Sequence, residues 1–241
     1  MNESNLNNSI AVITGSSRGL GKNLAKHFLK NGYTVLGCSR GDKTIDHKNY
    51  QHDTVDVGNE AHVRSWALNI KKNFGKVDVL ICNAGLVRSA LLLTMTPSNE
   101  AEAIVRTNYI GVFNVLREFS KIMVLRRAGR IITISSTMTL LHEEGTAVYT
   151  ATKAAVIETT KVLSKELAPL GITCNVISPA MMWTDSSESF TLGGDWQRRM
   201  LNKQTFPRLI EFEEICYVAD FFASPSSGSI TGQIIHIGMT S

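Results

Sequence analysis

Short apolar runs recur along this chain of 241 residues, and longer stretches with apolar positions every three or four residues separate them. Most of the short runs are apolar throughout, which is typical of strands that helices cover on both faces. The longer stretches have the period of amphipathic helices. Their regular alternation predicts an α/β chain with a doubly wound parallel sheet. The predicted strands are Ile10–Thr14, Thr34–Cys38, Val77–Cys82, Arg130–Ser135, Ile172–Ile177 and Gln233–Ile237.

The helical stretches follow the strands in turn. No internal repeat, low-complexity tract or linker interrupts this order, so we expect a single domain over residues 1–241, with residues 1–8 as a flexible tail. Ligands of such sheets bind at the carboxyl ends of the strands, and we expect the functional loops there. The predicted helices are Gly21–Asn31, Glu60–Phe74, Glu100–Val124, Ala151–Leu170 and Phe212–Ala223.

Composition narrows the classes of function. The 25 basic and 21 acidic residues are interspersed, without the basic run that is typical of nucleic-acid binding. The N-terminus has no signal-peptide layout, and no apolar stretch approaches the roughly 20 residues of a membrane span. The four cysteines lack metal-ligand spacing, so we expect buried thiols and no metal site. We therefore expect a cytoplasmic protein that binds neither nucleic acid nor membrane.

A glycine-rich turn joins the first strand to the first helix, with the sequence TGSSRGLG over residues 14–21. Glycines allow a tight turn and close approach of the backbone to a pyrophosphate, and a helix N-terminus offers free N–H groups. The spacing differs from the common G-x-G-x-x-G, but the strand before it and the helix after it match a dinucleotide site. A plain glycine-rich turn is the alternative. The predicted phosphate-binding residues are Gly15, Ser17, Arg18, Gly19, Leu20 and Gly21.

Tyr149 and Lys153 lie four residues apart at the start of a predicted helix. Side chains at this spacing share one face, with Cβ atoms about 5–6 Å apart. Such a pair also occurs by chance on helix surfaces, where the lysine is simply solvated. The spacing alone leaves both interpretations open.

The TGxxxGxG turn and the late YxxxK pair together resemble the short-chain dehydrogenase/reductase family. Its members have a single Rossmann-like domain, and the resemblance runs from Ile10 to Ile237. By this resemblance, Asn108, Ser136, Tyr149 and Lys153 form the catalytic set. Further residues at the family's cofactor-contacting positions are Asp56, Val57, Asn83, Ala84, Gly85, Pro179 and Thr184, with Tyr149 and Lys153 also contacting the cofactor.

The resemblance implies a chemical role for each member of the set. Reduction of a ketone needs a proton on oxygen, and a phenol with a pKa near 10 is poorly matched to neutral pH. A nearby ammonium favours the phenolate, by roughly 4 kcal/mol at about 4 Å in an effective dielectric near 20. We therefore expect Lys153 to lower the pKa of Tyr149, which donates the proton. Ser136 then orients the substrate oxygen, and Asn108 holds a proton-relay water.

The end of the second strand indicates which nicotinamide cofactor binds. Relatives that use NAD usually have an aspartate there, where this chain has Ser39 followed by Arg40. A dianionic 2′-phosphate favours a guanidinium and is repelled by a carboxylate, so we expect NADP(H), with Arg18 also nearby. Asp42 is the alternative, because a small shift of its loop brings it to the ribose.

Within the family, the chain looks most like the 3-oxoacyl-acyl-carrier-protein reductases. Arg88, Leu91 and Leu92 preserve part of the segment that follows their NAG motif. Arg127 occupies one of two arginine positions that those reductases use for carrier docking, but the second position is Leu170. A solvated basic turn is the alternative role of Arg127. The carrier protein is therefore an uncertain partner beside a small carbonyl or acyl substrate.

The substrate side departs from the family pattern at several positions. His142, Glu143 and Glu144 lie near the expected mouth, where two carboxylates favour a polar or cationic substrate unless they belong to a solvated turn. Ala180 replaces the usual glycine after Pro179, and the chain ends without the usual D-G-G. A set of aromatic and sulfur-containing residues forms either a lid over an apolar pocket or part of the core. These residues are Met181, Met182, Trp183, Phe190 and Trp196.

These observations predict an NADPH-dependent carbonyl reductase, with a 3-oxoacyl thioester as the first substrate class. A secondary alcohol, a polyketide or a sugar-like ketone is the alternative substrate. A catalytically silent NADP-binding regulator is the alternative of a different class. Relatives are usually tetramers, and we expect a homotetramer or homodimer paired through the helices Glu100–Val124 and Ala151–Leu170.

Overall fold

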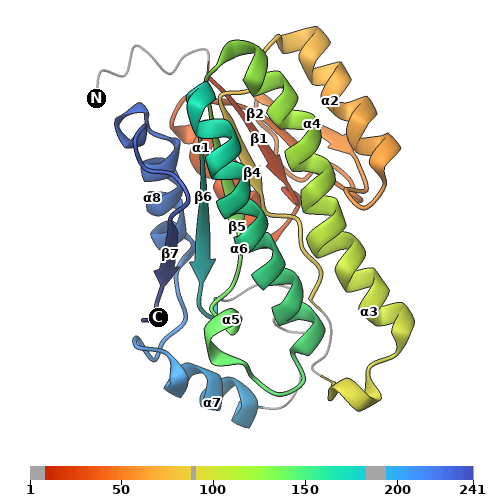
Figure 1. Cartoon of the computed structure of the whole chain (residues 1–241), viewed down its shortest axis with the longest axis vertical. Helices are drawn as coiled ribbons and strands as arrows, with labels where there is room; N and C mark the ends of the chain where they lie inside the picture. Colours follow the sequence, from red (N-terminus) through yellow and green to blue (C-terminus); the bar gives the residue numbers. More distant parts are fainter. Residues whose placement is uncertain (1–8, 88–90, 183–193, 241) are drawn as a thin grey trace.

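The computed structural model describes residues 9–87, 91–182 and 194–240. A single parallel sheet forms the central layer, and helices cover both of its faces (Figure 1). The strand order is β3-β2-β1-β4-β5-β6-β7, so the chain reverses direction across the sheet between β1 and β4. This confirms the predicted doubly wound α/β fold.

Six of the seven strands agree with the prediction to within a few residues, because five of them are mostly buried and β7, which is partly buried, is still an apolar run. The exception is β3, which is an edge strand with β2 as its neighbour. Its sequence, YQHDT, is mostly polar, so it has no apolar run to reveal it. The strands are β1 (Ile10–Thr14), β2 (Thr34–Ser39), β3 (Tyr50–Thr54), β4 (Val79–Cys82), β5 (Gly129–Ile134), β6 (Ile172–Pro179) and β7 (Ile234–Ile237).

All five predicted helices are present, and Glu60–Phe74 and Phe212–Ala223 have the predicted boundaries. Two further helices, α5 and α7, were not predicted. The predicted helix Glu100–Val124 is interrupted by a π-turn, η3, around Asn108. The α-helices are α1 (Gly19–Lys30), α2 (Glu60–Phe74), α3 (Ser98–Val105), α4 (Gly111–Arg126), α5 (Met138–Leu141), α6 (Ala147–Leu167), α7 (Gly194–Lys203) and α8 (Phe212–Ala223). The shorter turns are η2 (Leu93–Met95), η3 (Arg106–Ile110), η4 (Ala168–Leu170) and η5 (Pro225–Ser227).

Two hydrophobic cores lie on opposite faces of the sheet. One packs α2, α4 and α6 against the strands, with the T-shaped ring pair Trp66–Phe119 inside it. The other packs α1 and α8 against the opposite face, around Phe28 and Phe222. Together the two cores bury both faces of the central strands, which is why those strands read as uninterrupted apolar runs.

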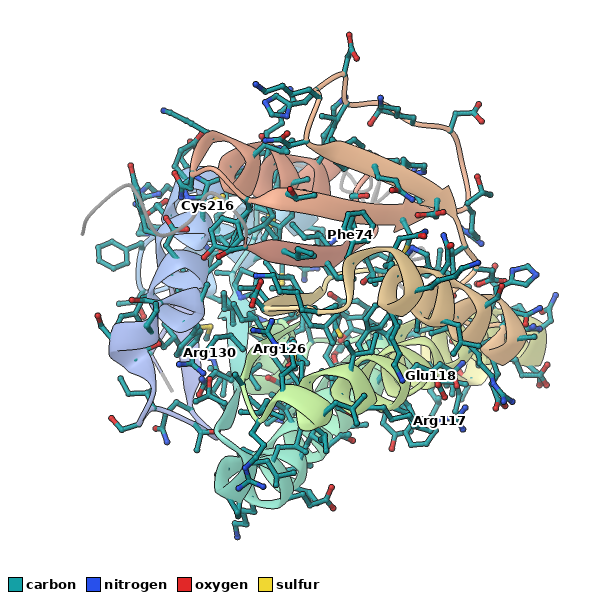
Figure 2. The ribbon with its side chains drawn as sticks, turned by 90° about the horizontal axis from the view of Figure 1, so that it is seen from above. Phe74, Arg117, Glu118, Arg126, Arg130 and Cys216 are labelled. Carbon is teal, nitrogen blue, oxygen red and sulfur yellow. The ribbon has the colours of Figure 1, made fainter. Side chains whose placement is uncertain are left out.

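Charged side chains join neighbouring elements, and several of them are labelled in Figure 2. The labelled Arg130 of β5 donates to the Ser224 carbonyl at 3.4 Å and to the Gly171 carbonyl at 3.4 Å. On α4, Arg117 and Glu118 pair at 2.9 Å, and Arg117 also reaches Glu60 of α2. These contacts join secondary-structure elements, whereas α5 and α7 lie at one end of the molecule (Figure 1).

No helix in the described ranges is long and apolar enough to cross a membrane. All four cysteines are buried and free, as expected. Within residues 9–87, 91–182 and 194–240, no group of three or more His, Cys, Asp or Glu side chains is placed to hold a metal ion. Residues 1–8, predicted as a tail, lie outside the described residues.

Candidate active site

A cavity of about 700 Å³ opens at the carboxyl ends of the strands, beside the point where the strand order reverses. This is where ligands of such sheets bind. Thr184, another predicted contact, lies outside the described residues, as do Arg88, Trp183 and Phe190. The predicted cofactor residues that line the cavity are Gly15, Ser17, Arg18, Gly19, Leu20, Gly21, Ser39, Arg40, Asp56, Val57, Asn83, Ala84, Gly85, Tyr149, Lys153 and Pro179.

The glycine turn has the geometry of an anion cradle. Gly15 and Gly19 have positive φ angles of 71° and 52°, in the left-handed region that favours glycine. A Cβ atom on Gly21 would lie 2.2 Å from the Gly15 carbonyl oxygen, so the first turn of α1 requires glycine at this position too. Arg18, the N-cap of α1, makes no side-chain capping hydrogen bond. The first N–H groups of the helix are therefore left for an anionic ligand.

The Asn83-Ala84-Gly85 segment is fastened to this turn. The Thr14 hydroxyl accepts hydrogen bonds from the backbone N–H groups of Asn83 and Ala84, both at 3.0 Å. The Asn83 side chain in turn donates to the Thr14 carbonyl at 3.0 Å. These bonds lock the ends of β1 and β4 together, so the floor of the cavity is rigid.

The end of β2 presents positive charge to the cavity. Ser39 and Arg40 both line it, and Arg40 is exposed. No carboxylate among the described residues pairs with Arg40 or Arg18. Asp42, the alternative ribose ligand, does not line the cavity. The charge at this end therefore favours a phosphate over a neutral ribose hydroxyl.

Ser136, Tyr149 and Lys153 meet at the other end of the same cavity. Ser136 is the second residue after β5, and α6 begins at Ala147, so Tyr149 and Lys153 are stacked one turn apart in the same helix. The Lys153 ammonium lies 5.7 Å from the centre of the Tyr149 ring and donates to the Ile134 carbonyl at 2.9 Å. The predicted common face of the pair is thus confirmed.

The predicted lowering of the Tyr149 pKa is wrong. Burial raises the pKa of Tyr149, and its hydrogen bond with Ser136 opposes that rise only in part. Burial also lowers the pKa of Lys153 to about 8, because no carboxylate in the described part of the chain pairs with this ammonium. The ammonium lies over the ring and donates to the Ile134 carbonyl. Tyr149 is accordingly a protonated phenol at neutral pH, the form that donates a proton.

Asn108 lies apart from the other three residues of the predicted catalytic set. It is fully buried in the π-turn η3 and does not line the cavity. Its side-chain oxygen accepts from the Leu86 N–H at 2.6 Å, and its nitrogen donates to the Leu86 carbonyl at 2.9 Å. A Cβ atom on Gly85 would lie 3.7 Å from both the Asn108 oxygen and the Lys153 nitrogen. Asn108 therefore fixes the backbone beside Lys153.

Apolar side chains form the mouth of the cavity above Ser136. Met181, Met182 and Trp196, three of the predicted lid residues, line it together with Met138 and Leu209. Trp196 belongs to α7, where it is 7% exposed. Trp196 is therefore buried and also lines the cavity, and Met182 packs against the core, so packing and lining are combined in these side chains.

The acidic residues near the mouth do not form a site for a cationic substrate. Glu143 is nearly buried, and its carboxylate forms an ion pair with Lys203 of α7. This contact joins the loop after Ser136 to the helix over the cavity. Glu144 is exposed and does not line the cavity. The prediction that two carboxylates favour a cationic substrate is therefore wrong for Glu143.

Two other departures are resolved by backbone geometry. Among the described residues other than glycine, only Arg127 and His142 have positive φ, so Ala180 occupies an ordinary conformation that does not require glycine. The C-terminal end packs on the segment after α7, since the Phe206 N–H donates to the Gly238 carbonyl at 3.2 Å. The different C-terminus thus supports the helix over the cavity.

Arg127 lies far from the cavity lining, at the turn after α4. Its guanidinium donates to the Pro169 carbonyl at 2.8 Å and so links that turn to the end of α6. This contact gives Arg127 a structural role. The resemblance had implied that Arg127 docks an acyl carrier protein.

Sequence reasoning missed several residues of the cavity wall. Some of these residues lie at the end of a predicted strand or just after it, and this position could have identified them. No sequence motif indicated them. They are Cys38, Gly41, Val55, Val87, Thr107, Ile134, Ser135, Thr137, Met138, Thr146, Gln197 and Leu209.

Known proteins share both this sequence pattern and this fold. The profile of the short chain dehydrogenase family matches residues 9–193. The 3-oxoacyl-[acyl-carrier-protein] reductase of Salmonella typhimurium is 35% identical over 234 residues, which cover 95% of each chain. The structure of ElxO with NADP bound superposes with a TM-score of 0.88 at 29% identity, covering 95% of this chain and 97% of that one. The structure of a variant of the actinorhodin polyketide ketoreductase with NADPH superposes with a TM-score of 0.87 at 25% identity. The match covers 95% of this chain and 96% of that one. The chain belongs to the short-chain dehydrogenase family.

Proposed function

We propose that the protein is an NADPH-dependent carbonyl reductase, which reduces a ketone to a secondary alcohol. One observation carries this proposal: a phenol, a hydroxyl and a buried ammonium lie at one end of the cavity whose other end is a glycine cradle. Relatives with this fold include a reductase of 3-oxoacyl groups and a polyketide ketoreductase.

The cradle fits a dinucleotide, because the backbone at Gly15, Gly19 and Gly21 leaves no room for side chains and the start of α1 has free N–H groups. When bound, NADPH supplies the hydride. Arg18, Ser39 and Arg40 are the groups that we propose to hold its 2′-phosphate. ElxO and the actinorhodin ketoreductase, with similar folds, carry NADP or NADPH in their structures.

Each catalytic side chain has a defined task in the proposed reaction. Ser136 donates a hydrogen bond to the substrate oxygen and so stabilises the negative charge that develops there. Tyr149 transfers its proton to that oxygen, and its raised pKa keeps the proton in place at neutral pH. Lys153 brings a positive charge beside Tyr149 and carries hydrogen-bond donors for the cofactor ribose. Asn108 holds the backbone at Leu86 and so keeps the wall next to Lys153 in position.

The substrate class follows from the mouth of the cavity. Met138, Met181, Met182 and Trp196 make it apolar, which favours a ketone on an apolar chain, such as a 3-oxoacyl thioester or a polyketide. A sugar-like ketone would leave its hydroxyl groups unpaired there. Docking of an acyl carrier protein through Arg127 has little support, because that guanidinium already binds the Pro169 carbonyl.

The proposed function is tested by NADPH oxidation against a panel of ketones, with acetoacetyl thioesters, decalones and ketoses. We expect saturable turnover on the apolar members and a kcat/KM with NADPH about ten- to a hundredfold above that with NADH, as charge-assisted hydrogen bonds to a phosphate predict. Equal efficiency with both cofactors would contradict the NADP(H) assignment. Saturable NADPH binding without turnover on any ketone would favour a silent regulator instead.

We also propose a homotetramer or homodimer, and a cytoplasmic location consistent with four buried free thiols. Val105 and Phe113, along α3 and α4, are 39% and 43% exposed, and Val162 of α6 is 57% exposed. These apolar side chains support pairing through the two helices predicted for it. Light scattering at micromolar concentration should give a mass two or four times that of one chain. A mass equal to one chain would rule out the assembly.

A further inference from the structure

A chain of hydrogen bonds runs from the glycine turn through β3 to the end of β2. The Ser16 hydroxyl lies 2.9 Å from that of Tyr50, which lies 3.0 Å from Nδ1 of His52. Nε2 of His52 then lies 3.1 Å from the Ser39 hydroxyl and 3.0 Å from the Gly41 carbonyl oxygen. Ser39 and Gly41 line the cavity, so His52 stands directly behind its wall.

The acceptor at the end of this chain determines where the imidazole proton lies. The Gly41 carbonyl can only accept, so Nε2 of His52 carries hydrogen. The Ser39 hydroxyl donates to the same carbonyl at 3.0 Å and accepts from the Gly41 N–H at 3.3 Å. His52 therefore holds both the Ser39 hydroxyl and the turn that carries Arg40.

The strand between the two hydroxyl groups is built to let them meet. A Cβ atom on Gly37 of β2 would lie 2.3 Å from the Ser16 oxygen and 2.5 Å from the Tyr50 oxygen. Glycine inside a strand weakens it, so a structural reason is needed for its presence. Ser16 is fully buried and Tyr50 is 5% exposed. The space that a side chain at position 37 would fill is occupied by this hydrogen bond.

Every hydroxyl in this chain of hydrogen bonds has a partner whether His52 is neutral or charged. With neutral His52, Tyr50 donates to Nδ1 and Ser16 donates to Tyr50. With charged His52, Nδ1 donates to Tyr50, Tyr50 donates to Ser16, and Ser16 donates to the Cys38 carbonyl at 3.4 Å. An imidazolium therefore fits without leaving a buried hydroxyl unpaired.

No carboxylate among the described residues pairs with His52, and its titratable neighbours are either neutral or exposed. Burial raises the pKa values of the Tyr50 phenol and the Cys38 thiol, so both are neutral near pH 7. The Asp53 carboxylate lies on the opposite face of β3, where it accepts from the Trp66 indole at 3.0 Å. The remaining charged or titratable side chains nearby, all exposed, are Arg18, Arg40, Asp42, Lys43, Asp46, His47 and Lys48.

We propose that His52 is a positioning residue, and that it makes the protein prefer a dinucleotide with a 2′-phosphate over one without it. This rests on the NADPH-dependent activity proposed above and adds a residue behind the cavity wall. His52 acts through Ser39, whose hydroxyl and turn it holds, so that the Ser39 hydroxyl and the turn carrying Arg40 keep their place at the end of the cavity where we propose that the 2′-phosphate binds.

Binding of NADP⁺ and NAD⁺ by calorimetry tests the inference in wild type and in His52→Gln, which keeps a neutral N–H donor. At pH 6.5 we expect His52→Gln to weaken NADP⁺ binding about three- to fivefold and to leave NAD⁺ binding within about twofold. The matched control is His62→Gln, an exposed histidine of α2, which should change neither affinity.

Tyr50→Phe provides a second, independent variant. It removes the hydroxyl that supports His52 and keeps the buried ring, so we expect a loss of NADP⁺ affinity about half as large on a logarithmic scale, with NAD⁺ affinity unchanged. Equal weakening of both dinucleotides in His52→Gln and Tyr50→Phe would show a merely structural role and overturn the inference, as would unchanged binding of both. Wild type that binds NADP⁺ no more tightly than NAD⁺ would instead contradict the proposed cofactor, and the role of His52 with it.

Discussion

Replacing Tyr149 by phenylalanine is expected to lower kcat for ketone reduction about 10²- to 10⁴-fold, the range of general acid catalysis. The substitution removes the proton donor and its hydrogen bond with Ser136, but it keeps the ring beside the Lys153 ammonium. NADPH affinity should therefore stay within about twofold, since the cradle at Gly15 is untouched. Steady-state kinetics and fluorescence titration with NADPH measure the two quantities separately.

The matched control is Tyr217→Phe. Tyr217 is 67% exposed on α8 and takes no part in the cavity, so this variant should keep the wild-type kcat. Wild-type turnover by Tyr149→Phe would refute the role of the phenol. Loss of both turnover and NADPH binding would point to a collapsed site rather than a missing proton.

Replacing Lys153 by methionine is expected to abolish turnover and weaken NADPH binding, while making the protein more stable. The side chain is 5% exposed and its ammonium has no carboxylate partner among the described residues, so the fold bears the cost of burying its charge. Lowering the Lys153 pKa from 10.5 to about 8 corresponds to about 3 kcal/mol. Methionine has similar length and no charge to desolvate, so the free energy of unfolding should rise by roughly 2–3 kcal/mol.

The sign of the pH dependence follows from the direction of the shift. Because the folded pKa of Lys153 is depressed, the folded state binds fewer protons than the unfolded state between about pH 8 and 10.5. The cost of the charge is therefore fully present below pH 8 and disappears as the pH rises toward 10.5. Urea denaturation at pH 7 and pH 10 should show the larger advantage of Lys153→Met at pH 7. An equal or smaller advantage at pH 7 would contradict the lowered pKa.

A control separates this effect from a general response to losing a lysine. Lys161 lies in the same helix, but its side chain is 42% exposed and pairs with Glu158 at 2.8 Å. Lys161→Met should change the free energy of unfolding by less than about 1 kcal/mol, as is usual for an exposed ion pair. Its turnover should match wild type.

The local sequence pattern was sufficient to predict much of the fold and the glycine-turn end of the cavity. Strands buried on both faces carry continuous apolar runs, and this is why β1, β4 and β6 were predicted correctly. The glycines of residues 15–21 were also readable, because positive φ and close backbone approach restrict a position to glycine whatever surrounds it. The common face of Tyr149 and Lys153 follows from helical spacing alone.

The hydrophobic pattern did not predict elements whose structure depends on a contact with a residue distant in the sequence. The edge strand β3 has few apolar residues, and its place beside β2 depends on pairing such as Val35 with Tyr50. The π-turn at Asn108 widens a helix whose sequence remains helical throughout, and its reason is the contact with Leu86, 22 residues away. The pairing of Glu143 with Lys203 spans 60 residues and is invisible to any local window.

By itself, the sequence determined six of the seven strands, the glycine cradle and the common face of Tyr149 and Lys153, because period and glycine geometry are local properties. Only the tertiary structure decided the electrostatics. Packing half-buries Tyr149 and buries Lys153 beside it, and desolvation disfavours the charged form of each group more than either neighbour compensates. It likewise placed His52 behind Ser39, since a chain of hydrogen bonds across three segments exists only once β1, β2 and β3 lie side by side.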